Sequence, residues 1–183
     1  MGNLDISQER KIMPQHLFEH YVMARSHTFA SEKEALLGLN IPGLKGYRYP
    51  EEPLVDNPFI YEDNYNDDVS RPGNFAGFEL NRDRAKGKEY TLYVYAGGLT
   101  KEGLELGEKV VYSILSIFLK AHAAEVRFGK KVIFTIKDGE DIWVYEGDGE
   151  VKPWGWEDNE TIKRNYTLLY ELNGNGVCFI KGF

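Results

Sequence analysis

The chain has 183 residues, with 29 acidic and 22 basic side chains, a formal net charge of −7 and a single cysteine. This length suits one domain over residues 1–183, and the acidic balance argues against nucleic acid or an anionic membrane as a partner, because binding phosphate groups requires clustered Lys and Arg. One cysteine excludes an intrachain disulfide, and the first residues lack the apolar stretch of a secretory signal, so we expect a cytoplasmic protein.

The first predicted element is a helix from about Pro14 to Ser26. Apolar side chains recur there at helical spacing, for example at Leu17 and Tyr21. Residues 30–58 then hold four prolines and three glycines, which restricts regular structure to short pieces. Within them, "KGYRYP" (residues 45–50) predicts one edge strand that ends at its proline.

Three further strands are predicted next, in the stretches "FIYEDNY", "NFAGFELNR" and "EYTLYVYA" (residues 59–65, 74–82 and 89–96). The glycine pair Gly97 and Gly98 follows the last of them. It lacks both GxxxxGK[ST] and GxGxxG, so a turn is favoured over a phosphate-binding loop. We therefore expect the strand to end there and a helix to begin, with Thr100 as its cap.

A long helix over about residues 104–128 is predicted from a wide apolar face, whose residues Val111, Ile114, Leu115 and Phe118 should face the sheet. The rest reads as antiparallel strands joined by hairpin turns at "KDGED" and "NGNG" and by the longer loop "GDGEVKPWGWEDNE". The expected fold is therefore α+β: a mostly antiparallel, strongly twisted sheet packed against one long helix and an N-terminal helix.

Two groups of residues resemble metal sites without matching one. His16 and His20 lie four apart on the predicted helix, but "HLFEH" does not match HExxH and offers no third ligand. The acidic stretch "YEDNYNDD" lacks the glycine and the final glutamate of a calcium-binding loop. We predict no metal and no cofactor, with a surface histidine pair and a solvated acidic loop instead.

The strongest functional signal is a tyrosine-rich sheet face. Alternate residues of a strand share a face, so the three strands after residue 58 each contribute one group. If the strands are neighbours, these groups form one surface with two carboxylates and a glycine gap at Gly77. Trp154 and Trp156 lie on a predicted loop that could cover it as a lid. The residues expected to bind a ligand are Asp63, Tyr65, Glu79, Tyr93, Tyr95, Trp154 and Trp156; the alternative is an ordinary half-buried sheet with a loop over it.

The order of "PGLKGYRY", "YEDNY", "NFAGFE" and "GKEYTLYVYAGG", followed by the long helix and "LLYEL", resembles an uncharacterised bacterial domain family. Domains of that family occur alone or C-terminal to helix-turn-helix regulators. The resemblance covers about residues 15–180 and implies a single cytosolic α+β domain with a sensory or interaction role and no assigned catalytic activity. The residues before Leu17 are too few for a helix-turn-helix, so the regulator architecture is not expected here.

Three functions remain open from the residues. The first is a binding module for a small polar or cationic molecule or a partner on the tyrosine-rich face. The second is a hydrolase-type enzyme with Asp63 and Glu79 as an acid/base pair. The third is a structural domain that forms a homodimer through the same face. In the first case, Glu79→Gln should weaken ligand binding and leave stability nearly unchanged.

Overall fold

The computed structural model describes residues 13–28, 35–41, 43–51, 58–67 and 73–180. In these ranges, three helices and nine strands are found. The helices are α2 (Gln15–His27), α3 (Lys101–Leu106) and α4 (Glu108–Ala121). The strands are β1 (Leu36–Leu37), β2 (Lys45–Tyr49), β3 (Phe59–Asp67), β4 (Asn74–Asp83), β5 (Lys88–Leu99), β6 (Val132–Asp138), β7 (Asp141–Lys152), β8 (Gly155–Arg164) and β9 (Thr167–Cys178).

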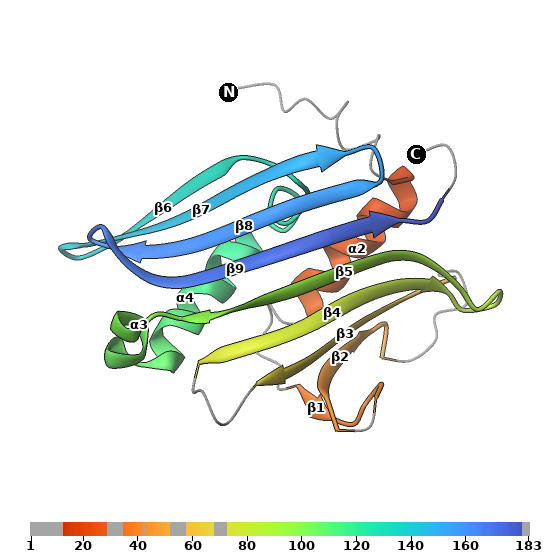
Figure 1. Ribbon diagram of the computed structural model, residues 1–183, viewed down its shortest axis with the longest axis horizontal. Coiled ribbons are helices and arrows are strands. Elements are labelled where there is room, and N and C mark those ends of the chain that lie inside the picture. Colours follow the sequence, from red (N-terminus) through yellow and green to blue (C-terminus); the bar gives the residue numbers. More distant parts are fainter. Residues whose placement is uncertain (1–12, 29–34, 42, 52–57, 68–72, 181–183) are drawn as a thin grey trace.

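All nine described strands form one open sheet in the order β1-β2-β3-β4-β5-β9-β8-β7-β6, and every neighbouring pair is antiparallel. The sheet consists of two meanders that meet at β5 and β9 in its middle. After β5 the chain passes through α3 and α4 to the far edge and returns strand by strand from β6 (Figure 1). The predicted antiparallel α+β fold is confirmed. The strand predicted at the edge, β2, is instead the second strand, because β1 pairs with it on its outer side.

The helices α2 and α4 cover the same face of the sheet, and their buried side chains join its inward residues in one core (Figure 1). In α4, Val111, Leu115 and Phe118 are buried as expected, and Ile114 is half-buried against the same core. No helix among the described residues is long and apolar enough to cross a membrane.

The prediction of one long helix is wrong. Thr100 caps α3 as expected, because its side chain accepts a hydrogen bond from the Gly103 amide. Gly107 then interrupts the helix with φ 113° and ψ 123°, a conformation that glycine adopts readily and helices exclude. The second helix ends at Ala121, so residues 122–128 form an irregular segment that brings Arg127 under the sheet.

Two strands continue through glycines at which the sequence predicts a turn. The pair Gly97 and Gly98 does not end β5; a Cβ at either position would lie 2.4 Å from an atom of a neighbouring strand, so these glycines allow close strand packing. The "NGNG" stretch is likewise no turn, because β9 runs through it. The "KDGED" turn does connect β6 and β7, with Gly139 at φ 61°.

Strand β8 is not predicted from the sequence, which places residues 155–160 in the long loop. Its inward side chains include Asp158 and Glu160, so the apolar alternation that marks a half-buried strand is absent. The connection between β7 and β8 is in fact a tight turn at residues 153–154.

Leu115→Ala should lower the free energy of unfolding by about 2–5 kcal/mol, because it leaves a cavity where α4 meets the sheet. Leu115 is 7% exposed, whereas Ile117 on the same helix is 50% exposed. Ile117→Ala is the matched control and should change stability much less. Denaturant melts of both variants test the assignment, and equal losses would show that α4 does not bury the face described here.

Gly176→Ala should lower the free energy of unfolding by about 1–3 kcal/mol or more through overpacking. The added Cβ would lie 2.0 Å from the Trp156 ring, which covers this position in the core. Asn175→Ala is the control, because Asn175 lies on the same strand with its side chain exposed. Thermal melts that find the two variants equally stable would contradict the path of β9 through "NGNG".

Candidate functional site

The strand register brings the predicted tyrosine-rich face together. Asp63, Glu79 and Tyr93 are direct cross-strand neighbours on β3, β4 and β5. The next inward row holds Tyr65 and Tyr95, with Gly77 between them. This face is turned toward the helices, so its side chains are covered by α2 and α4 instead of by solvent.

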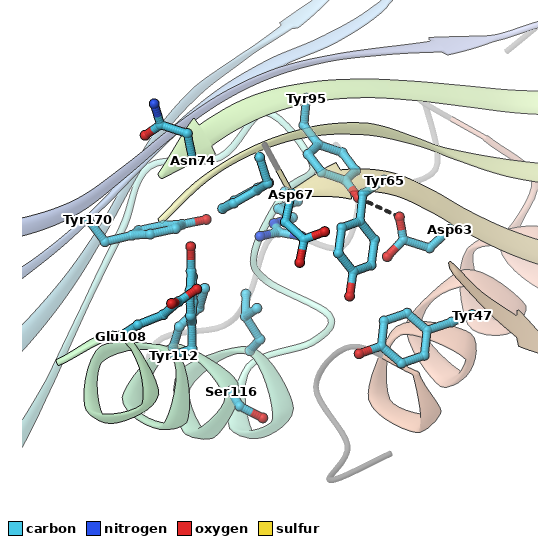
Figure 2. Close-up of a pocket in the computed structure, with 14 residues that line it drawn as sticks. Tyr47, Asp63, Tyr65, Asp67, Asn74, Tyr95, Glu108, Tyr112, Ser116 and Tyr170 are labelled. Carbon is cyan, nitrogen blue, oxygen red and sulfur yellow. Dashed lines mark hydrogen bonds between the residues drawn. The ribbon is translucent and has the colours of Figure 1, made fainter. Parts of the chain in front are cut away.

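Between this face and α4 lies a cavity of about 280 Å³, which we call the tyrosine cavity (Figure 2). Of the residues expected to bind a ligand, Asp63, Tyr65 and Tyr95 line it, and Glu79, Tyr93, Trp154 and Trp156 do not. The complete lining is Tyr47, Asp63, Tyr65, Asp67, Asn74, Phe75, Tyr95, Glu108, Tyr112, Leu115, Ser116, Leu119, Arg127 and Tyr170.

The two tryptophans do not form a lid. Trp156 is on β8, fully buried, and its ring stacks on Tyr93 with centroids 6.1 Å apart. Trp154 is in the β7–β8 turn and 48% exposed. The loop prediction failed because the two residues belong to a hairpin, whose second strand carries Trp156 to the inner face.

Glu79 is part of a buried charge network. Its Oε2 accepts hydrogen bonds from Arg25 Nη2 at 2.9 Å and Nε at 3.1 Å, and from the Tyr21 hydroxyl at 2.5 Å. Its Oε1 lies 3.6 Å from Arg127 Nη1. Arg127 in turn makes a two-point contact with Glu160, at 2.6 and 3.0 Å. Positive and negative side chains thus alternate from α2 through β4 and residue 127 to β8. Because Glu79 contacts both arginines, it links these elements.

Asp63 is the carboxylate at the floor of the tyrosine cavity. It is 2% exposed, and its Oδ1 accepts a hydrogen bond from the Tyr95 hydroxyl at 2.5 Å (Figure 2). Tyr95 reaches it across Gly77, where an added Cβ would lie 2.7 Å from the hydroxyl oxygen. Burial, reinforced by the neighbouring Glu79, raises the pKa of Asp63 to about 7, although the Tyr95 hydrogen bond opposes that shift.

Aromatic rings form the walls of the cavity. On one side, Phe75 contacts Tyr95, Tyr112 and Tyr170 with centroid distances of 5.9, 6.2 and 6.1 Å. On the other side, the rings of Tyr47 and Tyr65 stack at 6.3 Å. Such walls offer both apolar area and the negative ring faces that attract cations.

Carboxylates also stand at the more exposed part of the lining. Asp67 forms an ion pair with Lys45, and Glu108 is the first residue of α4 (Figure 2). The pKa of Tyr112 is raised by burial and then by the negative charges of Glu108 and Asp67. Glu108 therefore adds a negative charge to the cavity besides Asp63, whereas the charge of Asp67 is balanced by Lys45.

Several lining residues were missed, although most of them left a signal in the sequence. Asp67 continues the alternation of Asp63 and Tyr65, and Tyr47 is the cross-strand partner of Asp63. On α4, the lining residues follow one helical stripe, at positions 108, 112, 115, 116 and 119. Arg127 gave no signal, because its position depends on the irregular segment after α4.

The structure places the two groups of residues that resemble metal sites in a helix and in a strand. His16 and His20 lie against Phe59, with centroid distances of 5.4 and 5.5 Å, and burial lowers the pKa of His20 to about 4. His20 is therefore in the core and the predicted surface pair is wrong. The acidic stretch becomes part of β3 up to Asp67, while Asp68 lies outside the described residues.

No protein-family model, curated protein or solved structure matches this chain. The arrangement of its side chains therefore carries the functional argument.

Glu79→Gln should lower the free energy of unfolding by about 3–5 kcal/mol, because it leaves Arg25 buried without its counter-charge. This reverses the expectation from sequence that stability would hardly change. Glu105→Gln, which removes the partner of Lys101 in an exposed pair, is the control and should have little effect. Urea melts measure both, and a Glu79→Gln protein as stable as the parent would show that the network does not hold the fold.

Proposed function

We propose that this chain is a binding domain that holds a small polar molecule in the tyrosine cavity. The observation that carries the proposal is the convergence of polar and aromatic side chains from five strands and α4 on one concavity of about 280 Å³. Small-molecule sites occupy roughly 300–1,000 Å³, and this cavity lies just below that range, so its ligand should be small. This agrees with the sensory role that the sequence resemblance implies.

The lining distinguishes this cavity from a packing defect. Protein interiors pack to the density of organic crystals, and voids left in them are small and apolar. Here the walls carry the carboxylates of Asp63, Asp67 and Glu108 and a set of phenol hydroxyls. Groups of this kind hold a polar molecule or ordered water, and they give a ligand both contact area and orientation.

The two alternative functions have less support. Glu79 does not line the cavity and is fully buried against Arg25, which weighs against its use with Asp63 as an acid/base pair. The tyrosine-rich face is covered by helices, with Tyr93 fully buried and Tyr95 6% exposed, which weighs against that face as a dimer contact. Binding of a small molecule inside the tyrosine cavity is the function that agrees best with the lining and burial of these side chains.

Filling the cavity should abolish binding without disturbing the fold. Ser116 lines the cavity from α4, and Ser113 lies exposed on the same helix. A panel of amines, amino acids, polyols and small carboxylates can be screened by amide chemical shifts of the full chain. Molecules that bind should lose at least about tenfold in affinity in Ser116→Phe, since bulk in the cavity removes their contacts.

The matched control is Ser113→Phe, which adds the same ring on the exposed side of α4 and should leave affinity unchanged. Binding that survives equally in both variants would place the ligand outside the tyrosine cavity and contradict the proposal.

A further inference from the structure

Resting on the proposed function, we infer that the tyrosine cavity takes a small organic cation, whose ammonium group contacts Asp63 and displaces one proton from it. The inference adds the ligand class and a coupling between binding and protonation. It starts from the geometry of Asp63, the most deeply buried carboxylate of the lining.

One oxygen of Asp63 is engaged and the other is directed into the cavity. Oδ1 accepts a hydrogen bond from the Tyr95 hydroxyl, which leaves Oδ2 as the oxygen that can face a ligand. Figure 2 shows this second oxygen on the same side as the hydroxyl groups of Tyr65 and Tyr47. An N–H group that enters the cavity could donate a hydrogen bond to this second oxygen, and a charged donor would make that bond stronger.

The surroundings favour a positive ligand over a negative or neutral one. The rings of Tyr47, Tyr65 and Tyr95 surround the approach to Asp63, and aromatic faces attract alkylammonium groups. The cation among the lining residues, Arg127, is held by Glu160 and Glu79. At the opening, Lys45 balances the charge of Asp67, and the carboxylate of Glu108 adds a negative charge that repels anions and attracts cations.

A bound ammonium group would take the place of the proton on the Asp63 carboxyl. Burial and Glu79 raise the pKa of Asp63 to about 7, so a large fraction of the carboxyl is protonated at neutral pH. A bound ammonium favours the ionised form and lowers that pKa. Affinity should therefore rise with pH up to about 7, by as much as about tenfold per unit, and level off above it.

The charged and titratable groups that face Asp63 come from every element packed around it. Glu79 opposes ionisation, whereas Arg25 and Arg127 favour it. Burial raises the pKa of Tyr61, Tyr65 and Tyr95 above the ordinary tyrosine value, so these residues do not contribute to a transition near 7. The groups are Tyr21 and Arg25 from α2, Tyr47 from β2, Tyr61, Tyr65 and Asp67 from β3, Glu79 from β4, Tyr95 from β5, Glu108 from α4, and Arg127.

The test uses three probes of one shape and different charge: n-butylammonium, n-butanol and butyrate. Amide chemical shifts of the full chain report affinity, and calorimetry in buffers of different ionisation enthalpy counts released protons. We expect millimolar binding of butylammonium, because so small a ligand makes few contacts. Butanol should bind at least about tenfold more weakly, and butyrate should not bind. Proton release should approach one near pH 6 and vanish above pH 8.

Asp63→Asn keeps an acceptor for Tyr95 and removes the charge, so at pH 8 it should weaken butylammonium binding about 10- to 100-fold and abolish proton release. Asp158→Asn is the matched control. Burial also raises the pKa of Asp158 to about 7, but this residue does not line the cavity. Its variant should keep both the cation preference and the released proton, and amide spectra confirm that each variant is folded.

The outcomes separate the two proposals. Butanol or butyrate binding that is lost in Ser116→Phe, without a preference for butylammonium, would overturn the inference and leave the binding domain standing. Butylammonium binding that is unchanged in Asp63→Asn would overturn the role of Asp63. A wild-type chain that binds none of the three probes at saturating millimolar concentration would overturn the inference, while the ligand panel still tests the cavity.

Discussion

The buried ion pair between Arg25 and Glu79 is the constraint on which the rest of the structure depends. Removing both groups from water costs several kcal/mol for each ion. The pair is therefore stable only because its charged atoms are close and further hydrogen bonds satisfy the remaining donors and acceptors. Arg25 supplies two hydrogen bonds to one carboxylate oxygen, and it also donates to the backbone carbonyl of Val126. That last bond ties α2 to the segment after α4. Arg127 holds φ 60° in this segment, a strained conformation for a non-glycine residue, and reaches Glu160 from there. The network therefore fixes where both helical regions stand relative to the sheet.

The tyrosine cavity borders this network, and the two share Arg127. Within the network, the charges of Arg25 and Arg127 are balanced by Glu79 and Glu160. Asp63 is an additional acid beside this balanced set, and its ionisation is unfavourable because of burial first and the neighbouring Glu79 second. In the proposed function, a bound cation would supply the positive charge that Asp63 lacks. Stability and binding would then depend on two neighbouring carboxylates, Glu79 for the fold and Asp63 for the ligand.

Sequence patterns predicted the part of the fold in which inward residues are apolar or aromatic. Strands β3, β4 and β5 follow from alternation, and the inner row of Asp63, Glu79 and Tyr93 follows once they are neighbours. Strand β8 could not be predicted this way, because Asp158 and Glu160 interrupt the apolar residues on its inner face, and Glu160 is compensated by Arg127 from a distant segment. The role of Glu79 was misjudged for the same reason: nothing local shows that Arg25, 54 positions away, would be its partner. Long-range charge compensation is the information that alternation and propensity lack.

The glycine gap at Gly77 shows how a correct pattern acquired a different meaning in three dimensions. From sequence, a glycine among large side chains marks a place where something approaches closely. In the structure the approaching group is the Tyr95 hydroxyl, which crosses β4 above Gly77 and reaches Asp63 on β3. Similar spaces at Gly174 and Gly176 receive Tyr93 and Trp156, so large rings lie along the sheet instead of standing away from it. Gly77 thereby leaves room for Tyr95, whose hydroxyl orients the carboxylate at the floor of the cavity.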